Sequence, residues 1–136
     1  MTVTLYHNPA CGTSRNTLAM IRASGVEPTI VPYIDTGWSR DTLLSLAARI
    51  GVPLKALLRE KGSPAAELNL LRDDVSDDEL LAAMIAHPIL VNRPIVDTPR
   101  GTRLCRPSEL VFDLLDTPPV SFTKEDGETV QARPNR

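Results

Sequence analysis

The first part of the chain shows an alternation of polar and apolar positions that predicts a strand, a helix and a second strand. Residues 2–6 alternate, as is typical of a half-buried strand. Apolar residues then recur at helical spacing from Leu18 to Ala23, and Gly25 marks the expected end of that helix. The β-branched residues at 29–31 predict the second strand. This part of the chain is therefore predicted to form a β-α-β unit.

Helical periodicity governs the middle of the chain. Its first helix is expected between an N-cap at Ser39 and a stop at Gly51. A capping box formed by Ser76 and Glu79 predicts the start of its last helix, which Pro88 ends. Two shorter helices are expected between these, over residues 53–62 and 63–71.

Strand patterns return after residue 88. Residues 95–96 and 102–105 flank a turn at 99–101, so the pair predicts a hairpin. Pro107 is expected to open a final helix. Beyond Pro118 the chain is polar and contains prolines, and residues 118–136 are predicted to form a polar C-terminal tail.

The order of these elements predicts the fold class. It is β-α-β, a helical block, and then β-β-α, which without the block is the order of a thioredoxin-like domain. We therefore predict an α/β protein with one thioredoxin-like domain over residues 1–117 and a helical insertion at about 38–87, between the second and third strands. Such a fold does not by itself define a function.

Composition and charge argue against several classes of function. A net charge of -2 is unlike the basic footprint of a nucleic-acid binder, and the few aromatic residues offer no stacking surface. The chain has no long apolar run, and its N-terminus lacks the basic flank of a secretory signal, so we expect a cytoplasmic protein without a membrane partner. Its two histidines and two cysteines show no spacing typical of metal ligands.

Cys11 is the main candidate for chemistry. It lies between the first strand and the first helix, where free backbone N–H groups favour a thiolate and bind oxyanions. Gly12 permits close approach of a substrate, Thr13 and Ser14 add hydroxyl donors, and a protonated His7 is expected to lower the pKa of the thiol. The alternative is a buried structural cysteine, which these glycine- and hydroxyl-rich surroundings disfavour.

The neighbours of Cys11 exclude two other cysteine chemistries. Ser14 stands where a dithiol reductase carries its second cysteine, and Thr17 stands where a cysteine-based phosphatase carries its arginine. Cys11 therefore cannot form a local disulfide, and its thiolate must be resolved by some other thiol. For Cys105, the second cysteine, a structural role is favoured.

Three arginines are candidates for binding an oxyanion, since a guanidinium matches a tetrahedral oxyanion in geometry and charge. They are Arg59, Arg93 and Arg106. Any one of them taken alone would most often be a solvated surface charge. In a thioredoxin-like fold, however, the loop before the third strand faces the cysteine at the helix start and commonly contains a cis proline, and Arg93-Pro94 occupies that loop.

The sequence resembles the glutaredoxin-linked arsenate reductases of the ArsC family. The resemblance rests on the run HNPACGTSRNTL at 7–18 and on the segments at 57–59, 92–96 and 105–107, and it covers the chain up to about residue 115. It implies that Cys11 is the nucleophile, that His7 helps to activate it, and that the arsenic oxyanion binds to Arg59, Arg93 and Arg106. Ser14 matches a family serine near the cysteine and is expected to take part in binding the substrate.

The resemblance also implies a reaction. Arsenate would be reduced to arsenite with glutathione as co-substrate. Glutaredoxin would then reduce the resulting mixed disulfide between Cys11 and glutathione, and no cofactor would be tightly bound. Two alternatives stay open. One is a glutathione-dependent thiol oxidoreductase of the same fold, and the other is an Spx-like regulator that binds RNA polymerase, although such regulators usually carry the Cys-x-x-Cys that Ser14 breaks.

Overall fold

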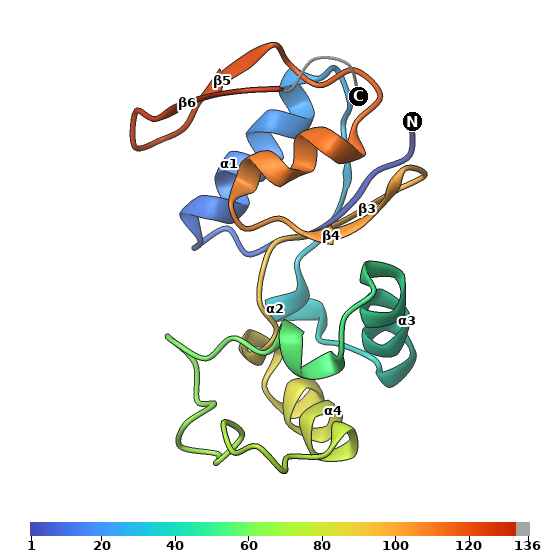
Figure 1. The fold of residues 1–136 in the computed structure, drawn as a ribbon, viewed down its shortest axis with the longest axis vertical. Helices are drawn as coiled ribbons and strands as arrows, with labels where there is room; N and C mark the ends of the chain where they lie inside the picture. Colours follow the sequence, from blue (N-terminus) through green and yellow to red (C-terminus); the bar gives the residue numbers. More distant parts are fainter. Residues whose placement is uncertain (133–136) are drawn as a thin grey trace. The chain divides into compact units, whose positions relative to one another are not determined.

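The computed structural model describes residues 1–132, and the chain divides into two units (Figure 1). The first unit comprises Met1–Pro32 and Arg93–Arg136, and the second comprises Tyr33–Asn92. The second unit contains the whole segment, about 38–87, for which the sequence predicts a helical insertion. Residues 133–136 of the expected tail lie outside the described residues.

A four-stranded sheet organises the first unit, in the order β2-β1-β3-β4. Strand β1 is parallel to β2 and antiparallel to β3, and β3 is antiparallel to β4. Leu5 lies opposite both Ile30 and Val96, at the centre of this register. The strands are β1 (Thr4–Tyr6), β2 (Thr29–Val31), β3 (Ile95–Thr98) and β4 (Gly101–Leu104). This sheet, with its helical crossover, confirms the predicted thioredoxin-like fold class.

Helix α1 (Gly12–Ala23) and the 3-10 helix η3 (Ser108–Leu114) pack side by side on one face of this sheet (Figure 1). Met20 and Ile21 of α1 are fully buried in the same cluster as Val111 of η3. Burying each such side chain contributes about 1.5–3 kcal/mol to the stability of the fold. Helix α1 is thereby held against the sheet.

The chain beyond Pro118 forms a hairpin, in a segment whose polarity predicts a surface tail. Strands β5 (Ser121–Thr123) and β6 (Thr129–Gln131) are antiparallel, with Phe122 opposite Val130. Both of these side chains pack against the core of the first unit. The flanking residues are polar and exposed, which explains why overall polarity conceals the strands.

Five helical segments make up the second unit. The predicted caps are confirmed: the Ser39 hydroxyl accepts the N–H of Thr42, Gly51 is left-handed at φ 84°, and Ser76 forms the capping box. The core side chains of α3 and α4 include Leu43, Leu46, Leu80 and Met84. The segments are α2 (Tyr33–Thr36), α3 (Arg40–Ile50), η1 (Leu54–Leu57), α4 (Asp77–Ala86) and η2 (Pro88–Leu90).

Two helix predictions in this unit were wrong. The helix expected over 53–62 is only the short η1, and the segment 63–71 forms turns. Gly62 and Asn69 both have positive φ, at 71° and 59°, which a right-handed helix cannot accommodate. The apolar spacing within 63–71 instead buries Ala65 and Leu70 from irregular backbone.

Candidate active site

Cys11 is the N-cap residue of α1, in the extended conformation that precedes a helix. Its carbonyl accepts the N–H of Arg15 at 3.0 Å, which is the first bond of the helix, and its own N–H donates to Asn8 O at 3.0 Å. Only 7% of the residue is exposed. The sulfur is thus held beside the unpaired backbone donors of the first helical turn.

These surroundings stabilise a thiolate. Burial opposes ionisation of Cys11, but the backbone N–H groups of Ser14 and Thr13 and the Arg93 guanidinium outweigh it, so the pKa of the thiol lies below its ordinary value. Arg93 acts both through its charge and through a hydrogen bond to the sulfur. A lower pKa increases the thiolate fraction at neutral pH, and the thiolate is the nucleophile.

The structure brings two of the three candidate arginines to this sulfur. Both precede cis prolines, at Arg93-Pro94 and Arg106-Pro107. Arg106 Nη1 lies 3.9 Å from Cys11 Sγ and donates to the carbonyl of Arg93 at 3.1 Å. Two guanidinium groups therefore flank the thiol, in a position to bind an anion that the thiol attacks.

His7 and Ser14, which lie on either side of Cys11 in the sequence, form a buried hydrogen-bonded pair. His7 Nδ1 lies 2.6 Å from Ser14 Oγ, which also accepts the N–H of Asn8 at 3.1 Å. Burial lowers the pKa of His7, so the imidazole is neutral near pH 7, and the Ser14 hydroxyl can donate to Nδ1. The imidazolium expected from the sequence fits this environment poorly, and the pair instead anchors the first turn of α1.

Arg59 belongs to the second unit. Its backbone N–H donates to Leu90 O at 2.7 Å, its Nε donates to Lys61 O at 2.9 Å, and its carbonyl accepts the Ser63 hydroxyl. Its part in oxyanion binding remains an expectation that rests on the motif at 57–59.

Cys105 lies in the hydrophobic core of the first unit. It is fully buried, and its Sγ lies 3.8 Å from the carbonyl of Arg103. Burial raises the pKa of this thiol to about 12. It is therefore protonated and inert under conditions in which Cys11 reacts, in agreement with the structural role favoured by the sequence.

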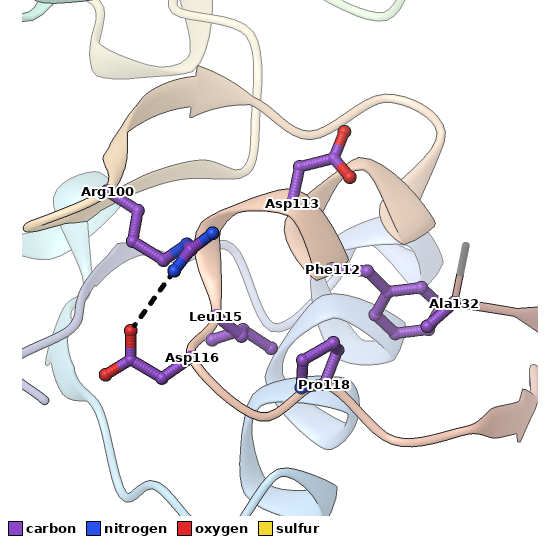
Figure 2. Close-up of a pocket in the computed structure, with 7 residues that line it drawn as sticks. All are labelled: Arg100, Phe112, Asp113, Leu115, Asp116, Pro118 and Ala132. Atoms are coloured by element: carbon purple, nitrogen blue, oxygen red, sulfur yellow. Dashed lines mark ion pairs between the residues drawn. The ribbon is translucent and has the colours of Figure 1, made fainter. Parts of the chain in front are cut away.

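A separate cavity in the first unit contains no thiol. Figure 2 shows that its charged groups come from the turn after β3 and from the end of η3, with an ion pair of 3.6 Å between Arg100 and Asp116. Asp113, another lining residue, pairs with Arg103 at 3.3 Å. Because these charges compensate one another, the cavity offers no site comparable to the one at Cys11.

Residues 1–132 contain no cluster of three or more His, Cys, Asp or Glu residues arranged to hold a metal ion. No helix in this described part of the chain has the length and apolar character needed to cross a membrane.

One contact near the site, between Arg15 and Glu125, was not predicted from the sequence. The guanidinium of Arg15 forms a two-pronged ion pair with the carboxylate of Glu125, from the turn of the β5–β6 hairpin, with both N–O distances at 2.9 Å. The two residues are 110 positions apart. No regular sequence spacing relates the two residues. The pairing could have been suggested only if the hairpin at 121–131 had been predicted from the sequence.

Comparison with known proteins agrees with this geometry. The profile of the ArsC family matches residues 6–113. An arsenate reductase of Escherichia coli is 58% identical over 129 residues, covering 94% of this chain and 92% of that protein. An arsenate reductase of Rhizobium meliloti strain 1021 is 60% identical over 131 residues, covering 96% and 94%. Among solved structures, the arsenate reductase from Vibrio cholerae superposes with a TM-score of 0.80 at 40% identity, covering 85% of this chain and 98% of that one. The chain belongs to the ArsC family.

Proposed function

We propose that this protein reduces arsenate to arsenite, with Cys11 as the nucleophile. The observation that carries the proposal is the thiol of Cys11 at the start of α1, with a lowered pKa and with Arg93 and Arg106 beside it. Arsenate is a tetrahedral oxyanion, and guanidinium groups with backbone N–H donors are suited to bind it. The names of the relatives support the same substrate.

Binding and attack use the same donors. Arg93 and Arg106 neutralise the oxyanion and orient arsenic toward the sulfur, and the N–H groups of the first helical turn stabilise negative charge there. The Cys11 thiolate then attacks arsenic, and one oxygen leaves as hydroxide or water. The product is a covalent sulfur–arsenic adduct in which arsenic is still pentavalent.

A thiol from another molecule completes the reduction, because Cys105 is buried and protonated. In our proposal a glutathione thiolate attacks the sulfur of the adduct, and the electron pair of the sulfur–arsenic bond leaves with arsenic. Arsenic is thereby reduced to the trivalent state, and the two sulfurs are oxidised to a mixed disulfide. Glutaredoxin then attacks the glutathione sulfur of that disulfide and releases the Cys11 thiolate.

Three further residues belong to the proposal with different roles. His7 and Ser14 are positioning residues, since their contact fixes the helical turn whose N–H groups face the sulfur. Arg59 is proposed as a third oxyanion-binding residue on the motif alone. No tightly bound cofactor enters the scheme, and glutathione is consumed as a co-substrate.

The test is NADPH oxidation that depends on arsenate, coupled through glutathione, glutaredoxin and glutathione reductase. Turnover should require arsenate and disappear in Cys11→Ser, because a serine hydroxyl is not ionised at neutral pH. Cys105→Ala is the matched control and should retain turnover. Arsenate-dependent turnover in Cys11→Ser would overturn the mechanism, and a folded wild-type protein without arsenate turnover would overturn the substrate.

A further inference from the structure

The Arg15–Glu125 pair lies directly beside the reactive cysteine. A Cβ atom built on Gly12, the residue after Cys11, would lie 3.6 Å from Arg15 Nη2 and 3.9 Å from Glu125 Oε1. Consecutive Cα atoms are about 3.8 Å apart, so Arg15 Nη2 lies within about 9 Å of the Cα atom of Cys11. Glu125 raises the pKa of Arg15, and the Cys11 thiolate adds a smaller effect in the same direction.

The geometry of Arg15 is that of a carboxylate-binding site. Its Nη1 donates to the carbonyl of Pro9 at 2.9 Å, which fixes the plane of the guanidinium without using its other edge. That edge, formed by Nε and Nη2, receives both oxygens of the Glu125 carboxylate at 2.9 Å. Such a fork recognises a carboxylate by shape as well as by charge.

The carboxylate that now occupies this edge can be exchanged. The side chains of Arg15 and Glu125 are 44% and 50% exposed, and exposed ion pairs contribute little net stability. The hairpin that carries Glu125 has other anchors, because Phe122 and Val130 pack against the core and the Glu125 N–H donates to Asn16 Oδ1 at 3.0 Å. Loss of the ion pair therefore leaves the hairpin attached.

We propose that the Nε–Nη2 edge of Arg15 binds a carboxylate of the thiol co-substrate, and that Glu125 occupies this edge while that co-substrate is absent. The inference rests on the proposed function, in which glutathione reacts at Cys11. Glutathione carries a glycine carboxylate six bonds from its sulfur, and an extended run of six such bonds spans about 7 Å. A glutathione sulfur at Cys11 can therefore place a carboxylate over Gly12, where Arg15 lies.

The test measures thiol exchange without arsenate, so that it is separate from the test of the arsenate substrate. The Cys11 thiolate attacks one sulfur of oxidised glutathione, forms a mixed disulfide and releases one glutathione thiolate. The rate is followed by mass spectrometry, with bis(2-hydroxyethyl) disulfide as a probe that has no carboxylate. Arg15→Gln should slow the reaction with oxidised glutathione by about threefold or more and slow the reaction with the neutral probe much less, since the charge of Arg15 has only a small effect on the Cys11 thiolate.

Two further variants sharpen the result. Glu125→Gln removes the competing carboxylate and should accelerate the reaction with oxidised glutathione only. Arg22→Gln is the matched control, since Arg22 on the same helix forms an equivalent fork with Glu27 at 2.9 and 3.0 Å and the variant loses the same charge. It should leave both rates unchanged.

Three outcomes would overturn the inference. Equal slowing in Arg15→Gln and Arg22→Gln would assign the effect to overall charge, and equal slowing of both probes in Arg15→Gln would assign it to the reactivity of Cys11. A slower reaction with oxidised glutathione in Glu125→Gln would mean that the ion pair itself, and not the free Arg15 edge, is required.

Discussion

The imidazole Nδ1 of His7 lies 2.6 Å from the hydroxyl oxygen of Ser14, and both side chains are buried. Ser14 contributes its backbone N–H to the sulfur of Cys11, while its hydroxyl is engaged with His7 and with the N–H of Asn8. His7 therefore reaches the thiol through Ser14, as a neutral partner that fixes a helical turn.

The neutral state of His7 predicts a pH dependence of stability. Burial lowers the pKa of His7 in the folded protein, so the unfolded chain binds a proton at a higher pH than the folded protein does. The contribution of His7 is fully present above the unfolded pKa of about 6.5 and is lost as the pH falls through the interval below it. The free energy of unfolding, measured in urea at pH 7.5 and pH 5.5, should decrease at the lower pH.

The matched variant is His7→Asn, whose side-chain amide can still contact Ser14 but does not titrate. The part of the pH dependence that is due to His7 should be missing from this variant. NMR titration of the imidazole gives the direct check. A pKa above 6.5 for His7 would contradict a neutral role and restore the imidazolium as the activating group.

Ser14→Ala tests whether the buried contact positions the thiol. The variant leaves the N–H of Asn8 and the imidazole of His7 without their partner, which should cost about 1–3 kcal/mol of stability. The first turn of α1 should loosen, so the pKa of Cys11, measured by thiolate absorbance at 240 nm, should rise.

Ser24→Ala is the control for that experiment, because Ser24 Oγ donates to the carbonyl of Ile21 at the opposite end of the same helix. It should leave the thiol pKa unchanged. An unchanged thiol pKa in Ser14→Ala as well would reduce Ser14 to a purely structural residue.

The two cysteines should differ sharply in their reactivity toward an alkylating reagent. The pKa of Cys11 lies below its ordinary value, whereas burial raises that of Cys105 to about 12. Limiting iodoacetamide at pH 7.5 should label Cys11 alone, as peptide mapping can show, and Cys105 should react only after unfolding. Labelling of Cys105 in the folded protein would mean that the core around it opens readily.

Local signals in the sequence were sufficient for most of the fold. The strand around Leu5 follows from alternation and the strand around Ile30 from its β-branched residues. The caps at Ser39, Gly51 and Ser76 follow from residue type alone, because each satisfies a local backbone requirement. Local signals were misleading at 63–71. There apolar spacing suggests a helix, but the left-handed residue Asn69 and tertiary burial of Ala65 and Leu70 determine irregular backbone.

The parts of the candidate site that depend on a single residue and its immediate neighbours in the sequence were predictable. Cys11 at a helix start is such a case, and the structure gives its thiol a lowered pKa. The neutral state of His7 depends on burial, and the contact between Arg15 and Glu125 depends on a hairpin 110 residues away. Neither is encoded in local spacing, so neither could be derived from the sequence.

The arginine series separates direct oxyanion binding from surface charge. Arg93→Ala and Arg106→Ala should each lower kcat/KM for arsenate by about 10²–10³-fold, the usual loss when one donor to a developing negative charge is removed. Arg93→Ala should also raise the pKa of Cys11, because it removes a charge and a hydrogen bond from the thiolate.

Arg59→Ala decides the role that only the motif assigns to this residue. We expect a loss of kcat/KM comparable to that in Arg106→Ala, with a normal melting temperature. Arg40→Ala is the matched control from the same unit, since Arg40 forms an exposed ion pair with Asp78 at 3.0 Å, and its kcat/KM should equal that of the wild type. If Arg59→Ala behaves like Arg40→Ala, arsenate is bound without Arg59, and Arg93 and Arg106 with the N–H groups of the first turn of α1 supply the binding.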